Sequence, residues 1–101
     1  MNFVVLITVL GISAMAAPAK EAAAAKFYSE KCAGCHGADG SGGSGPSLKG
    51  PLKHGSSLPA VTSVIKHGVP NTLMPPSGLS DALNKQLAQY VLRMQPKKGH
   101  R

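Results

Sequence analysis

The chain has 101 residues, enough for one domain, and contains only two Phe, two Tyr and no Trp. So few aromatic side chains cannot build a large apolar core, and a chain of this size then needs a disulfide, a metal or a large apolar cofactor as a further stabiliser. Eleven Lys and Arg against four Asp and Glu give a formal net charge of +7, but without interleaved aromatic residues or a recognised motif this charge does not favour nucleic-acid binding.

Residues 1–16 are predicted to form a cleavable signal peptide. Their apolar run, FVVLITVLGISAMA, is too short to span a bilayer and too uniformly apolar for one face of a surface helix. It ends in AMA, a pattern typical of cleavage after Ala16 or Ala17. Because no Lys or Arg precedes the run, an uncleaved anchor is the alternative. Cleavage would leave residues 17–101 as a periplasmic domain without a membrane span.

The first predicted helix runs from residue 20 to about residue 32, in the sequence KEAAAAKFYSEKC. It is rich in good helix formers, and it places Ala24, Tyr28 and Cys32 at i, i+4 and i+8 on one face. The glycine-rich and proline-containing residues 37–51 follow as a loop. No alternating apolar pattern that would indicate a strand is present, so an all-α fold is expected.

The second predicted helix is short and runs from Pro59 to about His67. Ser57 or Leu58 stands near its start, and Pro59 is favourable in the first turn of a helix. Gly68 is a typical C-terminal stop.

Residues 69–78 contain several prolines and are predicted to be irregular. A final helix, SDALNKQLAQYVLRM, is predicted with Ser80 as its cap, Asp81 at its positive end and Arg93 at its negative end. The polar tail, residues 95–101, is predicted to be flexible. The apolar stripe of the final helix consists of Leu83, Leu87, Tyr90, Val91 and Met94.

The sequence CAGCH, which holds Cys32, Cys35 and His36, fits three chemistries: a thiol–disulfide pair, half of a zinc site, or a haem attachment sequence. Zinc needs further Cys or His residues at compatible spacing, and the other histidines are scattered. A redox dithiol is expected at the start of a helix, whereas this motif follows one. Haem attachment uses all three residues: both thiols form thioethers and the imidazole binds the iron. The favoured cofactor is therefore one covalent haem c per chain, which would also supply the missing apolar core.

Met74 is the candidate for the second axial ligand of that iron. The sequence TLMPP places its thioether in an irregular segment stiffened by prolines. A methionine in such a segment can also be an apolar plug, and His54 and His67 leave a bis-histidine site open as an alternative. Met94 lies on the apolar stripe of the last helix and is expected in the core.

These residues resemble the class I cytochrome c family, in its compact bacterial form, over nearly all of residues 17–101. Tyr28 and Tyr90 match the aromatic positions at which the first and last helices of that family cross, and Ala24 matches the small residue that lets them approach. The resemblance implies an all-α cytochrome c fold, with three to four short helices wrapped around a covalently bound haem.

The resemblance also implies a set of site residues. The family's Gly-Pro-x-Leu-x-Gly segment appears as GPSLKG, residues 45–50. By this match the carbonyl of Pro46 accepts a hydrogen bond from the unligated ring nitrogen of His36, and Leu48 lines the haem pocket. The family's axial methionine, commonly followed by proline, falls on Met74.

The expected function is one-electron transfer in the periplasm with His36 and Met74 as axial ligands, either as a soluble monomeric carrier or as a small subunit of a respiratory dehydrogenase or oxidase chain. Two protein ligands leave no open position on the iron, so the chain is not expected to be an enzyme. The alternative is a haem-based protein that binds or senses a gas or peroxide through a labile Met74. The basic charge indicates redox partners with acidic docking surfaces, unless it serves only solubility.

Overall fold

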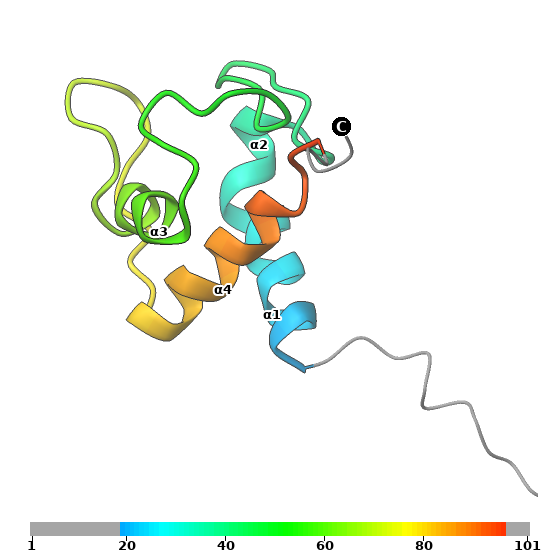
Figure 1. Cartoon of the computed structure of the whole chain (residues 1–101). Coiled ribbons are helices and arrows are strands. Elements are labelled where there is room, and N and C mark those ends of the chain that lie inside the picture. The colour runs from blue at the N-terminus through cyan, green and yellow to red at the C-terminus, as the bar shows by residue number, and fades with distance from the viewer. Residues whose placement is uncertain (1–18, 97–101) are drawn as a thin grey trace, which may run out of the picture.

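The structure, a computed structural model, describes residues 19–96. Its elements are α1 (Ala19–Phe27), the π-helical segment η2 (Tyr28–Cys32), α2 (Ala33–His36), α3 (Leu58–His67) and α4 (Asp81–Leu92) (Figure 1). Within residues 19–96 there is no strand, as expected. The predicted signal peptide and residues 97–101 of the predicted tail lie outside the described residues. None of the described helices has the length and apolarity needed to cross a bilayer.

The first helical unit is longer than predicted, because η2 and α2 continue the path of α1 as far as His36 (Figure 1). In η2 the amide of Ala33 bonds to the carbonyl of Tyr28, five residues earlier instead of four. Since a π-turn takes more residues than an α-turn, Cys32 falls short of a full turn from Tyr28. Tyr28 is buried, and Cys32 is half-buried but still packs against the core, so the last member of the expected column of Ala24, Tyr28 and Cys32 is less covered than the other two.

Helix α3 has the predicted signals at both ends. The Ser57 hydroxyl accepts a hydrogen bond of 3.2 Å from the amide of Ala60 and caps the first turn. Gly68 ends the helix with φ +72°, a conformation that favours glycine. Val61 and Ile65, one turn apart, turn inward and are buried.

Helix α4 begins as predicted but ends two residues earlier, at Leu92 instead of Met94. The Ser80 hydroxyl accepts from the amide of Leu83 at 3.2 Å and caps the first turn. Leu87 and Val91 of the predicted stripe are buried, and the other three members are half-buried. The stripe omitted two side chains that have no exposed surface at all, Asn84 and Ala88.

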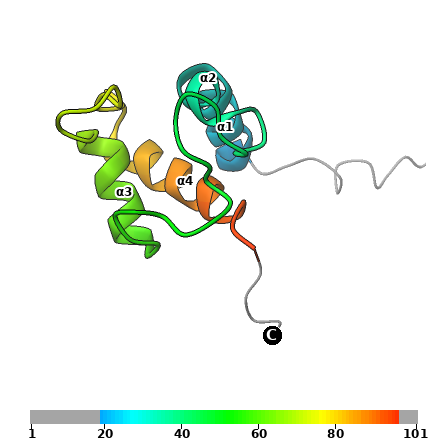
Figure 2. The same ribbon diagram turned by 90° about the horizontal axis from the view of Figure 1, so that it is seen from above.

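The core lies where α4 packs against α1 on one side and α3 on the other (Figures 1 and 2). At the α1 side the rings of Tyr28 and Tyr90 lie 5.3 Å apart between centroids, tilted by 42°. Ala24 is 1% exposed and lets the helices approach. The buried apolar side chains are Ala24, Tyr28, Val61, Ile65, Leu87, Ala88 and Val91. This core is small, as the shortage of aromatic residues predicted.

Candidate functional site

The CAGCH motif lies at the end of the first helical unit, with Cys32 closing η2 and Cys35 and His36 in α2. Cys32 stands three residues before Cys35 and four before His36, a spacing that on a helix brings its side chain near both of theirs. No disulfide joins the two cysteines in the described structure; Cys35 is exposed and Cys32 half-buried. The motif therefore offers two sulfurs and one ring nitrogen to a single group placed beside α2.

The His36 ring is oriented by the backbone. Its Nδ1 lies 2.8 Å from the carbonyl oxygen of Pro46, the contact that the resemblance implied. A carbonyl oxygen can only accept, so Nδ1 carries the proton and Nε2 keeps its lone pair. Nε2 is thereby left as the nitrogen able to bind a metal, and the hydrogen bond at Nδ1 strengthens it as a donor.

Glycines bring the Pro46 carbonyl to this position. The amide of Gly45 donates to the Cys35 carbonyl at 2.7 Å, and the amide of Gly42 donates to the His36 carbonyl at 2.7 Å. A Cβ atom at position 45 would lie 3.1 Å from Cε1 of His36 and 3.2 Å from Cβ of Cys35. Residue 45 is therefore a glycine because the loop runs directly over the histidine.

A side chain from beyond α4 fastens the same loop. The side-chain nitrogen of Gln95, Nε2, donates to the carbonyl of Leu48 at 2.5 Å and to the carbonyl of Gly50 at 2.9 Å. The backbone amide of Leu48 also donates to the carbonyl of Gly40 at 2.7 Å, and the Leu48 side chain packs against the core. Gln95 is the first residue of the segment predicted to be a flexible tail. Its role was missed because its hydrogen bonds join residues that are 45 and 47 positions apart in the chain.

Tyr28 holds the residue that follows the histidine. Its hydroxyl donates to the carbonyl of Gly37 at 2.6 Å. Burial, with smaller contributions from neighbouring charges, raises the pKa of Tyr28 to about 12. The hydroxyl is thus a proton donor at every physiological pH. Tyr28 therefore serves both the helix crossing and the turn at the motif.

The Cys32 thiol is not activated as a redox nucleophile. Burial raises its pKa, with the ammonium of Lys31 acting weakly in the opposite direction. A catalytic dithiol needs a lowered pKa, since the thiolate is the reactive form. The environment of Cys32 therefore gives no support to the dithiol alternative.

The Met74 segment, residues 69–79, forms internal hydrogen bonds beside the end of α3. The amide of Val69 donates to the Met74 carbonyl at 3.0 Å, and the Thr72 hydroxyl accepts from the Met74 amide at 3.2 Å. A Cβ atom at Gly68 would lie 2.7 Å from the Met74 carbonyl oxygen and from the backbone of Pro75 and Pro76. The Met74 side chain is half-buried, and its backbone packs closely against Gly68, the glycine that ends α3.

After the prolines, the segment is tied to both α3 and α4. The Ser77 amide donates to the Ile65 carbonyl at 3.0 Å, and its hydroxyl donates to Oδ1 of Asn84 at 2.5 Å. Asn84 Nδ2 donates to the Leu79 carbonyl at 3.3 Å. Sequence reasoning missed Asn84 because it is polar, although its spacing from Ala88 and Val91 is that of a core position.

The predicted site residues thus fall into two groups. Cys32, Cys35, His36 and Pro46 come together around α2, whereas Met74 stands on a separate segment, and no hydrogen bond among residues 19–96 joins the two groups. Figures 1 and 2 show α2 well apart from the yellow-green segment between α3 and α4, which carries Met74. Two sulfurs and one imidazole nitrogen close together can attach and ligate haem c, so the residues around α2 fit this cofactor.

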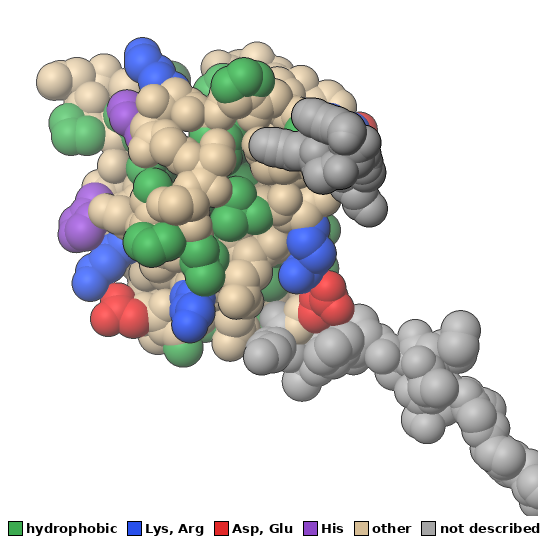
Figure 3. Space-filling model, in the orientation of Figure 1, with side chains coloured by type: hydrophobic (Ala, Val, Ile, Leu, Met, Phe, Trp, Pro, Cys, Tyr) green, Lys and Arg blue, Asp and Glu red, His purple; other side chains and the backbone are tan. Residues whose placement is uncertain are grey.

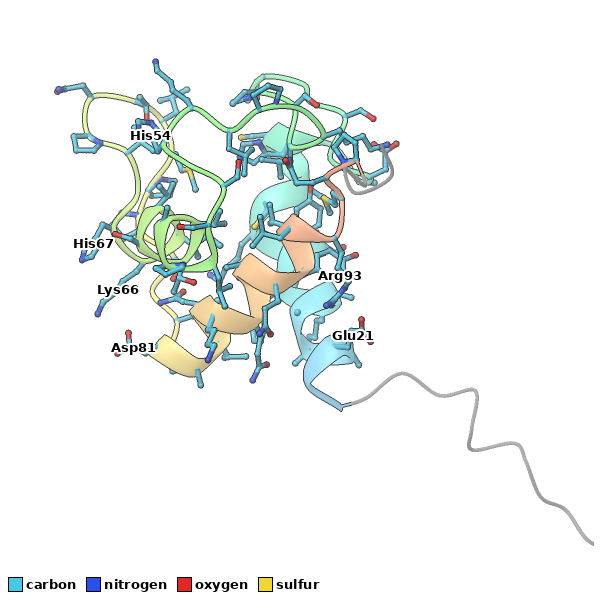
Figure 4. The ribbon with its side chains drawn as sticks, viewed as in Figure 1. Glu21, His54, Lys66, His67, Asp81 and Arg93 are labelled. Atoms are coloured by element: carbon cyan, nitrogen blue, oxygen red, sulfur yellow. The ribbon has the colours of Figure 1, made fainter. Side chains whose placement is uncertain are left out.

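The other candidate ligands lie elsewhere. His54 and His67 are exposed on the α3 side of the molecule, and both labelled side chains lie at its edge in Figure 4. Nδ1 of His67 lies 3.1 Å from the Ser63 carbonyl of its own helix. Met94 is half-buried and belongs to the core, and a Cβ atom at Gly40 would lie 2.6 Å from its sulfur.

On the face drawn in Figure 3, the charged side chains are spread out instead of gathered at one place. The described ion pairs, two of which are labelled in Figure 4, are Lys49–Asp39 at 3.2 Å, Lys66–Asp81 at 3.1 Å and Arg93–Glu21 at 2.8 Å. Asp39 also accepts from the hydroxyl and amide of Ser41, and these bonds together with Lys49 lower its pKa to about 2. Within residues 19–96 no ion pair involves Lys26, Lys31, Lys53 or Lys85.

The helical fold and the attachment motif define a class I c-type cytochrome. The family model described as cytochrome C oxidase, cbb3-type, subunit III matches residues 19–91, and the chain belongs to this family. The fold is similar to that of cytochrome CL from the marine methylotrophic bacterium Methylophaga aminisulfidivorans MPT, with a TM-score of 0.62 and 21% identity. That match covers 71% of this chain and 51% of the other, so this chain spans about half of that protein. No curated protein gives a significant match.

The family confirms the predicted fold and class. It implies covalently bound haem c. Cytochromes of this kind are electron carriers, generally not enzymes, and are typically exported.

Proposed function

We propose that this chain carries one electron in the periplasm on a single haem c, attached through Cys32 and Cys35 and ligated by His36 and Met74. It works as a soluble carrier or as a small subunit of a respiratory dehydrogenase or oxidase chain. The observation that supports this best is the 2.8 Å contact between Nδ1 of His36 and the Pro46 carbonyl, because it leaves Nε2 free beside both thiols.

Each residue has a distinct task in this proposal. The bound cofactor supplies an iron that gains and loses one electron at a potential set by its ligands and surroundings. The Pro46 carbonyl holds the His36 ring and strengthens its donor nitrogen. Met74 provides a neutral thioether, which favours the ferrous state and a high potential. Leu48, half-buried against the core, keeps water from the site.

The absorption spectrum tests this proposal. The purified protein should carry the mass of one haem and show low-spin bands with a methionine-to-iron charge-transfer band in the near infrared. Met74→Ala should abolish that band and lower the potential, whereas Met94→Ala, which removes the methionine at the end of α4, should keep it. High-spin haem that binds carbon monoxide readily in the unaltered protein would instead support the ligand-binding alternative.

The partner is proposed to be a redox protein with an acidic docking surface. The support is the net charge of +7 together with the lysines that form no ion pair among residues 19–96. Because these charges are spread over the surface, they would act as a whole on the approach of a partner. The rate of electron transfer to such a partner should fall steadily as the salt concentration rises, and a rate independent of salt would contradict this part of the proposal.

A further inference from the structure

Asn84 is the one polar side chain buried in the described core, with 0% of its surface exposed. Burying a carboxamide is unfavourable unless its polar atoms are hydrogen-bonded. Here Oδ1 accepts from the Ser77 hydroxyl at 2.5 Å and Nδ2 donates to the Leu79 carbonyl at 3.3 Å. An apolar residue would fill this position without needing partners, so the amide at this place calls for a reason other than packing.

Ser77, its partner, is held from three directions. Its amide donates to the Ile65 carbonyl in α3 at 3.0 Å, and its hydroxyl donates to Asn84 in α4. The same hydroxyl accepts from the amide of Leu79 at 3.1 Å. Residue 77 is therefore a fixed point of the chain between the two helices.

Only Pro75 and Pro76 separate this fixed point from Met74. Proline fixes its own φ and restricts the residue before it, so this stretch has little freedom to bend. The position of Ser77 therefore sets the position of Met74. On the other side, Met74 is held by backbone contacts with Gly68 and Val69 and by the Thr72 hydroxyl, none of which involves Ser77 or Asn84.

We propose that Ser77 and Asn84 are positioning residues whose hydrogen bond keeps Met74 on the iron. This inference rests on the proposed function, in which Met74 is the second axial ligand. A neutral thioether is a weak ligand, so its retention depends on how far the chain around it is pre-organised. Without the link to α4, the segment reaches its detached state at a lower free-energy cost, and an external ligand competes better for the iron.

The main variant is Ser77→Ala, which removes the hydroxyl and leaves the backbone intact. Ser80→Ala is the matched control. It also deletes one hydroxyl, the cap that accepts from the Leu83 amide at 3.2 Å, and so weakens α4 without touching the link to Met74. Ser77→Thr keeps a hydroxyl and should behave like the unaltered protein. Asn84→Leu keeps the branched outline in a somewhat larger side chain and deletes the other partner, so it gives a second test.

The experiment is a titration of the oxidised haem-loaded proteins with imidazole, following the methionine-to-iron charge-transfer band. For Ser77→Ala and Asn84→Leu the apparent Kd of imidazole should fall about fivefold, the effect of losing one hydrogen bond. Ser80→Ala and Ser77→Thr should stay within about twofold of the unaltered protein.

Equal effects of Ser77→Ala and Ser80→Ala would overturn the inference, since loss of general stability would then explain both. An unchanged affinity in Ser77→Ala would also overturn it, while Met74 ligation would stand as long as the unaltered protein shows the band. If the unaltered protein lacks the band, the Met74 assignment in the proposed function fails and this inference fails with it.

Discussion

The hydroxyl of Tyr28 lies 2.6 Å from the carbonyl oxygen of Gly37, so a residue of the helix crossing also fastens the turn that follows His36. Tyr28→Phe keeps the ring contact with Tyr90 but removes the stronger of the two donors to this carbonyl, which then keeps only the Gly40 amide at 3.1 Å. We expect the free energy of unfolding to fall by about 1–2 kcal/mol in urea titrations. Tyr90→Phe is the control, because the Tyr90 hydroxyl forms no hydrogen bond within residues 19–96, and a loss as large as that of Tyr28→Phe would contradict the assignment.

The same hydroxyl should make stability depend on alkaline pH. Burial raises the pKa of Tyr28 from 10.0 to about 12, so the unfolded chain releases this proton at a lower pH than the folded one. The stabilisation is complete below the unfolded pKa and is lost as the pH rises from 10.0 towards about 12. Unfolding measured across this range should show the loss in the unaltered protein and in Tyr90→Phe. Tyr28→Phe should lack that component of the decline.

Gly45→Ala tests the close approach of the loop to the histidine. The added methyl would lie 3.1 Å from His36 Cε1 and 3.2 Å from its Nδ1, so the ring or the loop must move. We expect a cost of about 1–3 kcal/mol in stability and a shifted reduction potential, because the hydrogen bond to Pro46 is disturbed. Gly50→Ala has open space around the new methyl and should match the unaltered protein in potentiometric titration. Equal potentials in all three proteins would count against the arrangement.

Gly68→Ala tests the contact between the end of α3 and the Met74 segment. Gly68 and Gly78 both have positive φ, +72° and +73°, but only at Gly68 does a methyl meet backbone atoms, at 2.7 Å. Gly78→Ala therefore measures the conformational penalty alone, about 1–2 kcal/mol. Gly68→Ala should cost at least about 1 kcal/mol more and weaken the charge-transfer band of the Met74 ligand. A band as strong as in Gly78→Ala would show that the contact does not position Met74.

Gln95→Glu tests the fastening of the loop that carries Pro46. A carboxylate cannot donate to the carbonyls of Leu48 and Gly50, so we expect a loss of about 2 kcal/mol in stability together with a shifted potential. Gln89→Glu introduces the same charge on α4, where the glutamine side chain makes no hydrogen bond among the described residues. If both variants lost the same stability, the negative charge and not the lost donor would be the cause.

The sequence predicted the elements whose signals are local. Ser57, Ser80 and Gly68 marked helix ends because a cap or a positive φ depends on neighbouring residues alone. The attachment motif was predicted for the same reason, since its chemistry is contained in adjacent residues. The contact between His36 and Pro46 came only through resemblance to a family, because the loop between them has no local rule for its path.

The features that were missed depend on tertiary structure. The π-turn in η2 is a slip of backbone hydrogen bonding by one residue, and no residue type in YSEKC announces it. Gln95 finds its acceptors 45 and 47 residues away, beyond the reach of any pattern. Asn84 was passed over because a polar residue is normally placed on the solvent side of a helix, and its burial becomes favourable only through its partners Ser77 and Leu79.

All the hydrogen bonds that hold the Met74 segment come from residues 65–84, whereas those around His36 reach from Tyr28 to Gln95. The Met74 segment and the region around His36 should therefore differ in how readily they unfold locally. Amides of residues 69–79 should exchange with deuterated water through brief local openings, while those of α2 should wait for nearly global unfolding. If Met74 binds the iron, its dissociation would then need only local unfolding of the native protein. How often it dissociates would be set by the stability of residues 69–79.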